Sequence, residues 1–194
     1  MPQLTRNDLW SLEEYANRRA AFRAAVIAHK RLRTVHLGSN VTLLFEDEKT
    51  VRYQIQEMLR IERTFESAGI QDELDVYNPL IPDGCNLKAT MLIEYPDPEE
   101  RAQRLRKLRG IERQTWVRAD GFGKCFAIAD EDLERENSEK TSSVHFLRFE
   151  LTAEMCAALK AGAALGMGID HEAYRVEIEE IAPETQTSLV SDLA

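Results

Sequence analysis

The sequence has 194 residues, 43% of them hydrophobic, and a formal net charge of −9 from 34 acidic and 25 basic side chains. This acidic balance argues against nucleic-acid binding, because such a surface needs surplus Lys and Arg to neutralise phosphates. No apolar run approaches the roughly 20 residues of a membrane span, and neither a signal peptide nor a membrane association is expected. Three isolated thiols, Cys85, Cys125 and Cys156, are typical of a reducing compartment, so we expect a cytoplasmic protein.

The first part of the chain is predicted to be mostly helical around one hairpin. Apolar residues at helical spacing indicate helices, and alternating apolar residues around Gly38 indicate the hairpin. The predicted elements are a long first helix ending near Arg33, strands at 34–37 and 41–45, a second helix from Thr50 to about Ser67, and a short helix at 70–77.

The second part of the chain is richer in strands. The predicted elements are a strand at 87–95, a charged helix at 98–108, a hairpin of 115–118 and 124–129, a polar loop at 130–142, a strand at 144–151, an Ala-rich helix capped by Thr152, a short strand from Ile169 and a last strand at 174–181. The order lacks strict βα alternation. We therefore predict an α+β fold, with a largely antiparallel sheet of two hairpins plus further strands, packed with about five helices.

The length of the chain suits one domain with a core large enough to fold without a disulfide or a structural metal. We therefore expect a single domain over residues 1–194. The residues after about 183 are expected to form a frayed tail, since chain ends are poorly ordered unless they are tied down.

Glu62 lies within the apolar stripe of the second predicted helix. At 100° per residue, Val51, Ile55 and Leu59 share one face, and Glu62 falls near its centre, one heptad after Ile55. Burying an unpaired carboxylate costs several kcal/mol, so Glu62 needs a partner or an opening to solvent. Three interpretations follow: an ion pair, for example with an Arg of the first helix; a cleft carboxylate that binds a metal or acts as a general base; or a misassigned helix phase.

His145 lies on the strand face that carries Leu147 and Phe149, so alternation places it inward. It is either a core histidine satisfied by one carbonyl or a ligand or general base. The sequence contains no HExxH zinc motif, no G-x-S-x-G elbow and no P-loop. The common catalytic signatures therefore do not assign a reaction.

The helix predicted at 98–108 has a strongly basic side. Its basic residues, with the one that follows it, are Arg101, Arg104, Arg106, Lys107 and Arg109. This side is either a solvated face balanced by Glu99 and Glu100 or a docking patch for an acidic partner. Because the whole chain is acidic, a protein partner is favoured over nucleic acid.

Several segments of the sequence resemble one bacterial family, that of domain of unknown function 3501, over almost the whole chain. These segments are Leu4–Arg6, Ser11–Tyr15, Leu43–Glu46, Gln54–Glu62, Tyr77–Leu80, Ala89–Thr90, Ile93–Glu94 and Ser143–Phe149. The resemblance brings no established activity. Genes of this family often neighbour rubrerythrin-like and iron–sulfur oxidoreductase genes, so the resemblance implies, by association, an accessory role in redox or peroxide metabolism.

Two hypotheses follow. In the first, the protein is a non-catalytic accessory module that docks on a redox protein through its charged helices. In the second, it is an enzyme or metal-binding protein with a carboxylate-centred site around Glu62, where hard ligands favour manganese, iron or magnesium over zinc. The candidate catalytic residues are Glu62 and His145; the candidate binding residues are Glu57, Arg60, Glu66, Glu73, Tyr77, Asn78 and Glu94; and the candidate metal ligands are Glu62, Glu66, Glu94 and His145.

Overall fold

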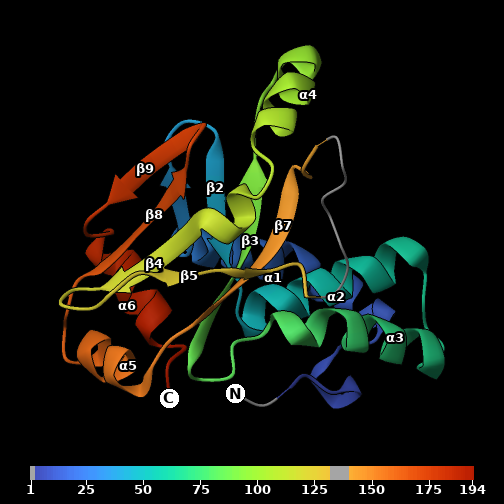
Figure 1. Ribbon diagram of the computed structural model, residues 1–194. Coiled ribbons are helices and arrows are strands. Elements are labelled where there is room, and N and C mark those ends of the chain that lie inside the picture. Colours follow the sequence, from blue (N-terminus) through green and yellow to red (C-terminus); the bar gives the residue numbers. More distant parts are fainter. Residues whose placement is uncertain (1–2, 132–139) are drawn as a thin grey trace.

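The computed structural model describes residues 3–131 and 140–194, which form an α+β fold (Figure 1). The α-helices are α1 (Leu12–Arg31), α2 (Glu48–Glu62), α3 (Ser67–Tyr77), α4 (Pro98–Lys107), α5 (Ala153–Lys160) and α6 (Pro183–Val190). The strands are β1 (Thr34–Leu37), β2 (Val41–Phe45), β3 (Asn86–Ile93), β4 (Thr115–Ala119), β5 (Cys125–Phe126), β6 (Ile128–Ala129), β7 (Val144–Glu150), β8 (Leu165–His171) and β9 (Tyr174–Ile178). Short 3-10 helices are η1 (Arg6–Asp8), η2 (Asn78–Leu80) and η3 (Ile111–Gln114).

The predicted α+β class with antiparallel pairing is confirmed, although the described strands form two antiparallel sheets where the prediction had one. One sheet has the order β1-β2-β3-β7-β6, and the other has the order β5-β4-β8-β9. The second predicted hairpin is only half correct, because β5 pairs with β4 whereas β6 crosses over and pairs with β7. The main apolar core includes buried side chains of both sheets, so we call this part of the molecule the two-sheet body.

Tyr174 joins the two sheets at one edge. Its hydroxyl donates to the Leu37 carbonyl at 2.6 Å and accepts from the Asn40 backbone N–H at 3.1 Å. Gly168 lies inside β8, which begins at Leu165, before the Ile169 at which a short strand was predicted to start. A Cβ added at Gly168 would lie 2.6 Å from the Trp116 ring, so only glycine permits this close packing.

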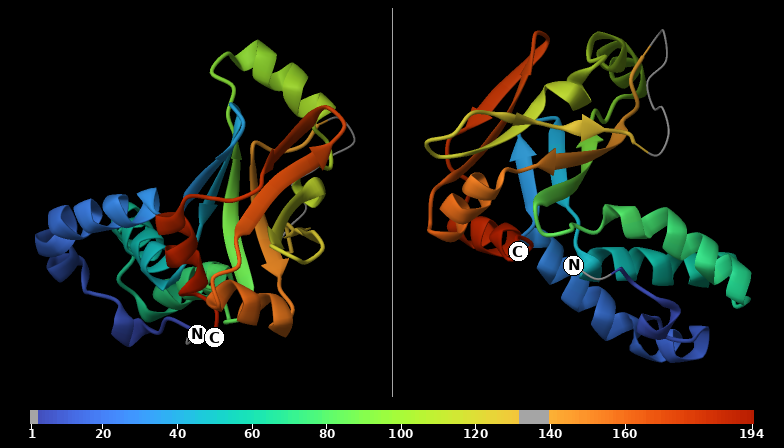
Figure 2. Two further views of the ribbon diagram at one scale, coloured as in Figure 1. Left: turned by 90° about the vertical axis from the view of Figure 1, so that its left-hand side faces the viewer. Right: turned by 60° about the horizontal axis from the view of Figure 1, so that its bottom comes forward.

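Helices α1, α2 and α3 lie together on one side of the two-sheet body, as Figure 2 shows; we call them the helical layer. The apolar side chains of α2 and α3 form a second core cluster with residues near the N-terminus. The prediction of one helix running to about Ser67 is wrong, because Arg63 adopts a left-handed conformation with φ 56° and ends α2. The predicted hairpin of β1 and β2 is confirmed.

The expectation of a frayed tail after about residue 183 is wrong. Residues Pro183–Val190 form α6, and Leu189 and Leu193 are buried in the main core. The Arg33 guanidinium donates to the Ser188 carbonyl at 3.0 Å and pairs with the buried Asp192 carboxylate. These contacts order the C-terminal segment against the end of α1. In the part of the chain that is described, no helix combines the length and apolarity needed to cross a bilayer.

Candidate functional site

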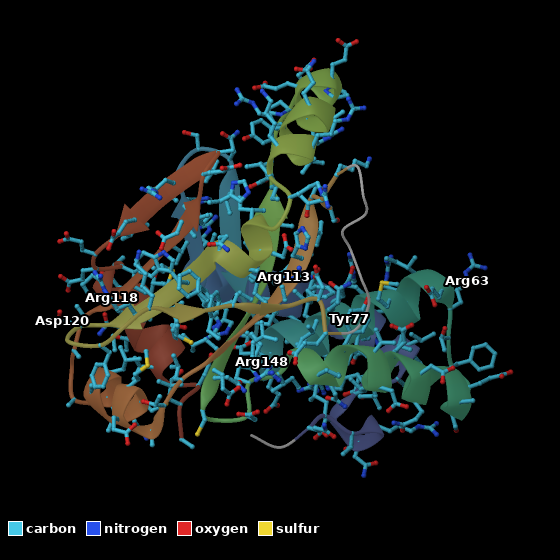
Figure 3. The ribbon with its side chains drawn as sticks, in the orientation of Figure 1. Arg63, Tyr77, Arg113, Arg118, Asp120 and Arg148 are labelled. Atoms are coloured by element: carbon cyan, nitrogen blue, oxygen red, sulfur yellow. The ribbon has the colours of Figure 1, made fainter. Side chains whose placement is uncertain are left out.

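Glu62 is exposed, so the prediction that it faces inward is wrong. The predicted helix phase is correct, because Val51, Ile55 and Leu59 are buried. However, Glu62 belongs to the last turn of α2, and Figure 3 shows the next residue, Arg63, at the outer end of the helical layer. Glu62 therefore lies on the same face of α2 as the apolar residues, but the last turn of the helix extends beyond the core.

The carboxylate of Glu62 lies close enough to Glu73 of α3 to influence its ionisation. Burial raises the pKa of Glu73, and the charges of Glu62 and Asp72 raise it further. Arg60 and Glu66 are exposed. The structure therefore brings Glu62 and Glu73 together at a surface position rather than in a cavity.

The ion pair expected between the second helix and an Arg of the first helix exists, but Glu57 makes it. Arg19 of α1 donates from Nε and Nη2 to the two Glu57 oxygens, at 2.7 and 2.8 Å. The buried Tyr15 hydroxyl donates to the same carboxylate at 2.5 Å. The Arg19 hydrogen bonds are the main reason that the pKa of Glu57 lies below its usual value. Glu57 therefore fastens α2 to α1.

Asn78 and Glu94 also make local structural contacts. The Asn78 amide clamps the backbone of Leu4, because Oδ1 accepts from its N–H and Nδ2 donates to its carbonyl, both at 2.9 Å. Glu94, just after β3, accepts from the Thr42 hydroxyl at 2.7 Å. These contacts account for the positions of both side chains, so neither requires a bound ligand.

His145 is fully buried, with 0% exposure, as the alternation of β7 predicted. Its Nδ1 lies 2.6 Å from the Asp130 carboxylate, and its Nε2 lies 2.9 Å from the Thr141 hydroxyl. Sequence reasoning missed Asp130 and Thr141, because no pattern links either residue to a strand that follows in the chain. The carboxylate–imidazole–hydroxyl chain resembles that of a nucleophilic site, but burial of the histidine and the hydroxyl denies a substrate access.

Glu112 lies beside this chain and is only 1% exposed. Its Oε2 accepts a long bond of 3.5 Å from Thr141. Among the described residues, its Oε1 has no hydrogen-bond partner, and the Arg113 Nε lies 3.9 Å away. Within residues 3–131 and 140–194, no three His, Cys, Asp or Glu side chains are placed to hold a metal ion. The predicted metal ligands Glu62, Glu66, Glu94 and His145 are thus not gathered into one site.

Tyr77 is the predicted binding residue that lines a groove. The groove has a volume of about 590 Å³ and lies between the end of α3 with η2 and the strands β3 and β7. Arg148 lines its strand side, and Figure 3 shows Tyr77 and Arg148 in this region. The size falls within the range of small-molecule sites.

Both cationic side chains that line the groove already have hydrogen-bond partners within the protein. Lys88 donates to the carbonyls of Pro79 and Ile81 at 2.7 and 2.8 Å, and burial lowers its pKa. Arg148 makes a two-pronged bond to Glu131, with both distances 2.8 Å. The groove is therefore an apolar recess with paired charges, not a convergence of reactive groups.

The most exposed charged element is α4, which projects from the two-sheet body (Figures 1 and 2). Only Leu105 is buried within it, and Leu108 is buried just after its end. Residues 101–109 contain five basic side chains and no acidic one, in a chain whose net charge is −9. All five are exposed: Arg101, Arg104, Arg106, Lys107 and Arg109. We call these five residues the α4 basic side.

Local interactions hold α4 in this position. Asp97 caps its first turn by accepting from the Glu100 N–H at 2.7 Å. Arg104 lies 3.3 Å from Glu100 and stacks 5.7 Å from the centre of the Tyr95 ring. The Thr141 N–H donates to the Leu105 carbonyl at 3.1 Å, so the helix is attached to the body mainly at its C-terminal half.

Comparisons with known proteins agree with this fold. The model of a family described as "Protein of unknown function (DUF3501)" matches residues 3–193. A crystal structure of a novel protein of unknown function from Burkholderia pseudomallei K96243 is 53% identical over 100% of both chains, with a TM-score of 0.95. No curated protein matches the chain.

Proposed function

The chain belongs to the family of proteins of unknown function DUF3501, and from this premise we propose that it is an accessory module that docks on a partner protein through α4. The observation that carries the proposal is the projection of α4 with its basic side in solvent. A helix with one buried residue gains little from packing. Its exposed charges are therefore accessible to a partner protein, and Arg104 also pairs with Glu100.

The charge of the α4 basic side indicates the chemistry of the partner. A positive patch on an acidic protein attracts acidic surfaces over a distance and aligns them before contact. Nucleic acid also offers negative charge, but the excess of acidic residues elsewhere in the chain repels phosphates. The proposed partner is accordingly an acidic face of another protein in the cytoplasm.

The proposed class of partner is a rubrerythrin-like protein or an iron–sulfur oxidoreductase. The support for this class is the link to redox and peroxide metabolism that the family resemblance implies by association. The paired charges of the groove and the inaccessibility of His145 support a docking role rather than a catalytic one.

The experiment is affinity purification of the tagged protein from the organism that encodes it. The test variant combines Arg104→Gln, Arg106→Gln and Lys107→Gln, and the matched control combines Arg23→Gln, Arg31→Gln and Lys160→Gln, which are exposed elsewhere. We expect wild type and control to retain a rubrerythrin-like or iron–sulfur protein, less of it as salt rises, and the test variant to lose it. Equal retention by both variants, or no such partner, would contradict the proposal.

The alternative prediction, a carboxylate-centred metal-binding protein or enzyme, has less support. Its central residue, Glu62, is exposed, and its predicted ligands lie on separate elements. Elemental analysis of protein purified without a tag tests it. Less than about a tenth of an equivalent of manganese, iron or magnesium counts against a resident metal.

A further inference from the structure

The fold brings together two cysteines that are far apart in the sequence. Cys85 immediately precedes β3, and its carbonyl accepts from the Leu151 N–H at 2.9 Å. One residue later, Thr152 caps α5, and its carbonyl accepts from the Cys156 N–H at 3.0 Å. Two backbone hydrogen bonds therefore position Cys156 next to Cys85.

The two thiols lie close enough for one to influence the other. Burial is the main reason that the pKa of Cys156 is raised, and the charge of the neighbouring Cys85 thiol raises it further. Cys85 is exposed, whereas Cys156 is buried. The pair thus combines a thiol that solvent reaches with a second thiol protected behind it, an arrangement found in peroxide-sensitive cysteines.

Cys125, the third cysteine, is placed differently. Its thiol donates to the Glu150 carbonyl at 3.0 Å, and burial is the main reason for its raised pKa. Neither Cys85 nor Cys156 is among the groups that influence it. Cys125 therefore provides an internal control.

We propose that Cys85 and Cys156 are a peroxide-sensitive dithiol that closes to a reversible disulfide. The Cys85 thiolate attacks one oxygen of hydrogen peroxide, the O–O bond breaks, and a sulfenic acid and one water form. The Cys156 sulfur then attacks the Cys85 sulfur, the S–O bond breaks, and a second water leaves. Two thiols lose two electrons and two protons, and the peroxide is reduced to two waters.

The surrounding structure favours closure by side-chain movement alone. The Cys85 loop is also held by the C-terminus, because the Ala194 N–H donates to the Gly84 carbonyl at 2.7 Å. These hydrogen bonds hold both backbones in place, so we expect the disulfide to close by side-chain rotation rather than by backbone movement. This site is independent of the α4 basic side, so either proposal can fail without the other.

The experiment exposes the reduced full-length protein to hydrogen peroxide, alkylates the remaining thiols with a maleimide, and maps peptides without reduction. We expect the loss of two of the three thiols, a linked peptide pair containing Cys85 and Cys156, an alkylated Cys125, and full recovery with dithiothreitol. Three alkylated thiols after treatment, a linkage that includes Cys125, or a linkage between two chains would overturn the proposal.

Two variants identify the order of the steps. Cys156→Ser is expected to stop at a Cys85 sulfenic acid that dimedone traps, because the resolving thiol is missing. Cys125→Ser is the matched control and is expected to lose both thiols as wild type does. Dimedone labelling at Cys156 in a Cys85→Ser variant, at the wild-type rate, would contradict the order. The wild-type peptide map decides the proposal even where a variant folds poorly.

Discussion

The two-sheet body and the helical layer hold their ionisable side chains in different ways. His145 lies in the two-sheet body, and Arg33 lies where α1 meets this body. Both side chains are at most 1% exposed, and each has several hydrogen-bond partners. In the helical layer Glu57 has a partly exposed pair with Arg19, and Glu62 lies at the surface. For these four side chains the number of partners follows depth, because a charge removed from water needs compensation. Buried Glu112, with one long hydrogen bond, is the exception. Mutational effects should decrease in the same order.

The largest expected effect is that of Arg33→Met. Arg33 donates to the carbonyls of Phe45 and Glu46, both at 3.1 Å, and pairs with the buried Asp192. The variant leaves Asp192 buried without its partner, so we expect the free energy of unfolding at pH 7 to fall by about 3–5 kcal/mol. Urea denaturation measures it. The exposed neighbour Arg31→Met should stay within about 0.5 kcal/mol of wild type, and a loss below about 1 kcal/mol in Arg33→Met would contradict the depth argument.

His145→Ala should have the next largest effect. Removal of the imidazole leaves the Asp130 carboxylate and the Thr141 hydroxyl without this partner in a buried region. We expect the free energy of unfolding to fall by about 2–3 kcal/mol, measured by the same denaturation. His36→Ala, at an exposed position, is the control and should change stability by less than about 0.5 kcal/mol. Equal decreases in the free energy of unfolding in His145→Ala and His36→Ala would show that burial depth is not the cause.

Glu57→Gln should destabilise the protein by about 1 kcal/mol at pH 7, because its charged bonds to Arg19 are partly screened by solvent. The pKa of Glu57 is lowered in the folded state, mainly by Arg19. Its contribution is therefore complete above the unfolded pKa of about 4.3 and is lost as pH falls through the folded pKa. Unfolding curves at pH 7, 5 and 3 should show wild type and variant converging on acidification. A difference that persists unchanged at pH 3 would rule out the ion pair as its source.

The smallest expected effect is that of Glu62→Gln. Because Glu62 is exposed, the free energy of unfolding should change by less than about 0.5 kcal/mol. The variant removes a negative charge that raises the pKa of Glu73, so that pKa should decrease. Carboxyl titration by NMR measures the shift. A stability loss above about 1 kcal/mol would mean that Glu62 has a buried partner after all.

Local signals in the sequence were sufficient for many elements. The β1–β2 hairpin follows from alternation around Gly38, and α5 begins where Thr152 caps it. The α4 basic side was also predictable, since exposed charges on a capped helix depend on few distant contacts. The division into two sheets was not predictable, because Ile128 and Ala129 leave β4 and pair with the distant strand β7, whereas Ala127 still donates to the Thr115 carbonyl.

The sequence by itself determined the α+β class, most helices and strands, and the direction in which each side chain leaves its element, because these depend on backbone periodicity and caps. Only the tertiary structure decided what each side chain meets. Glu62 lies on the predicted face of α2 but beyond the core. Cys85 and Cys156 are brought near each other by backbone hydrogen bonds that no local pattern encodes. The physical reason is that burial and pairing arise from packing between elements distant in the chain.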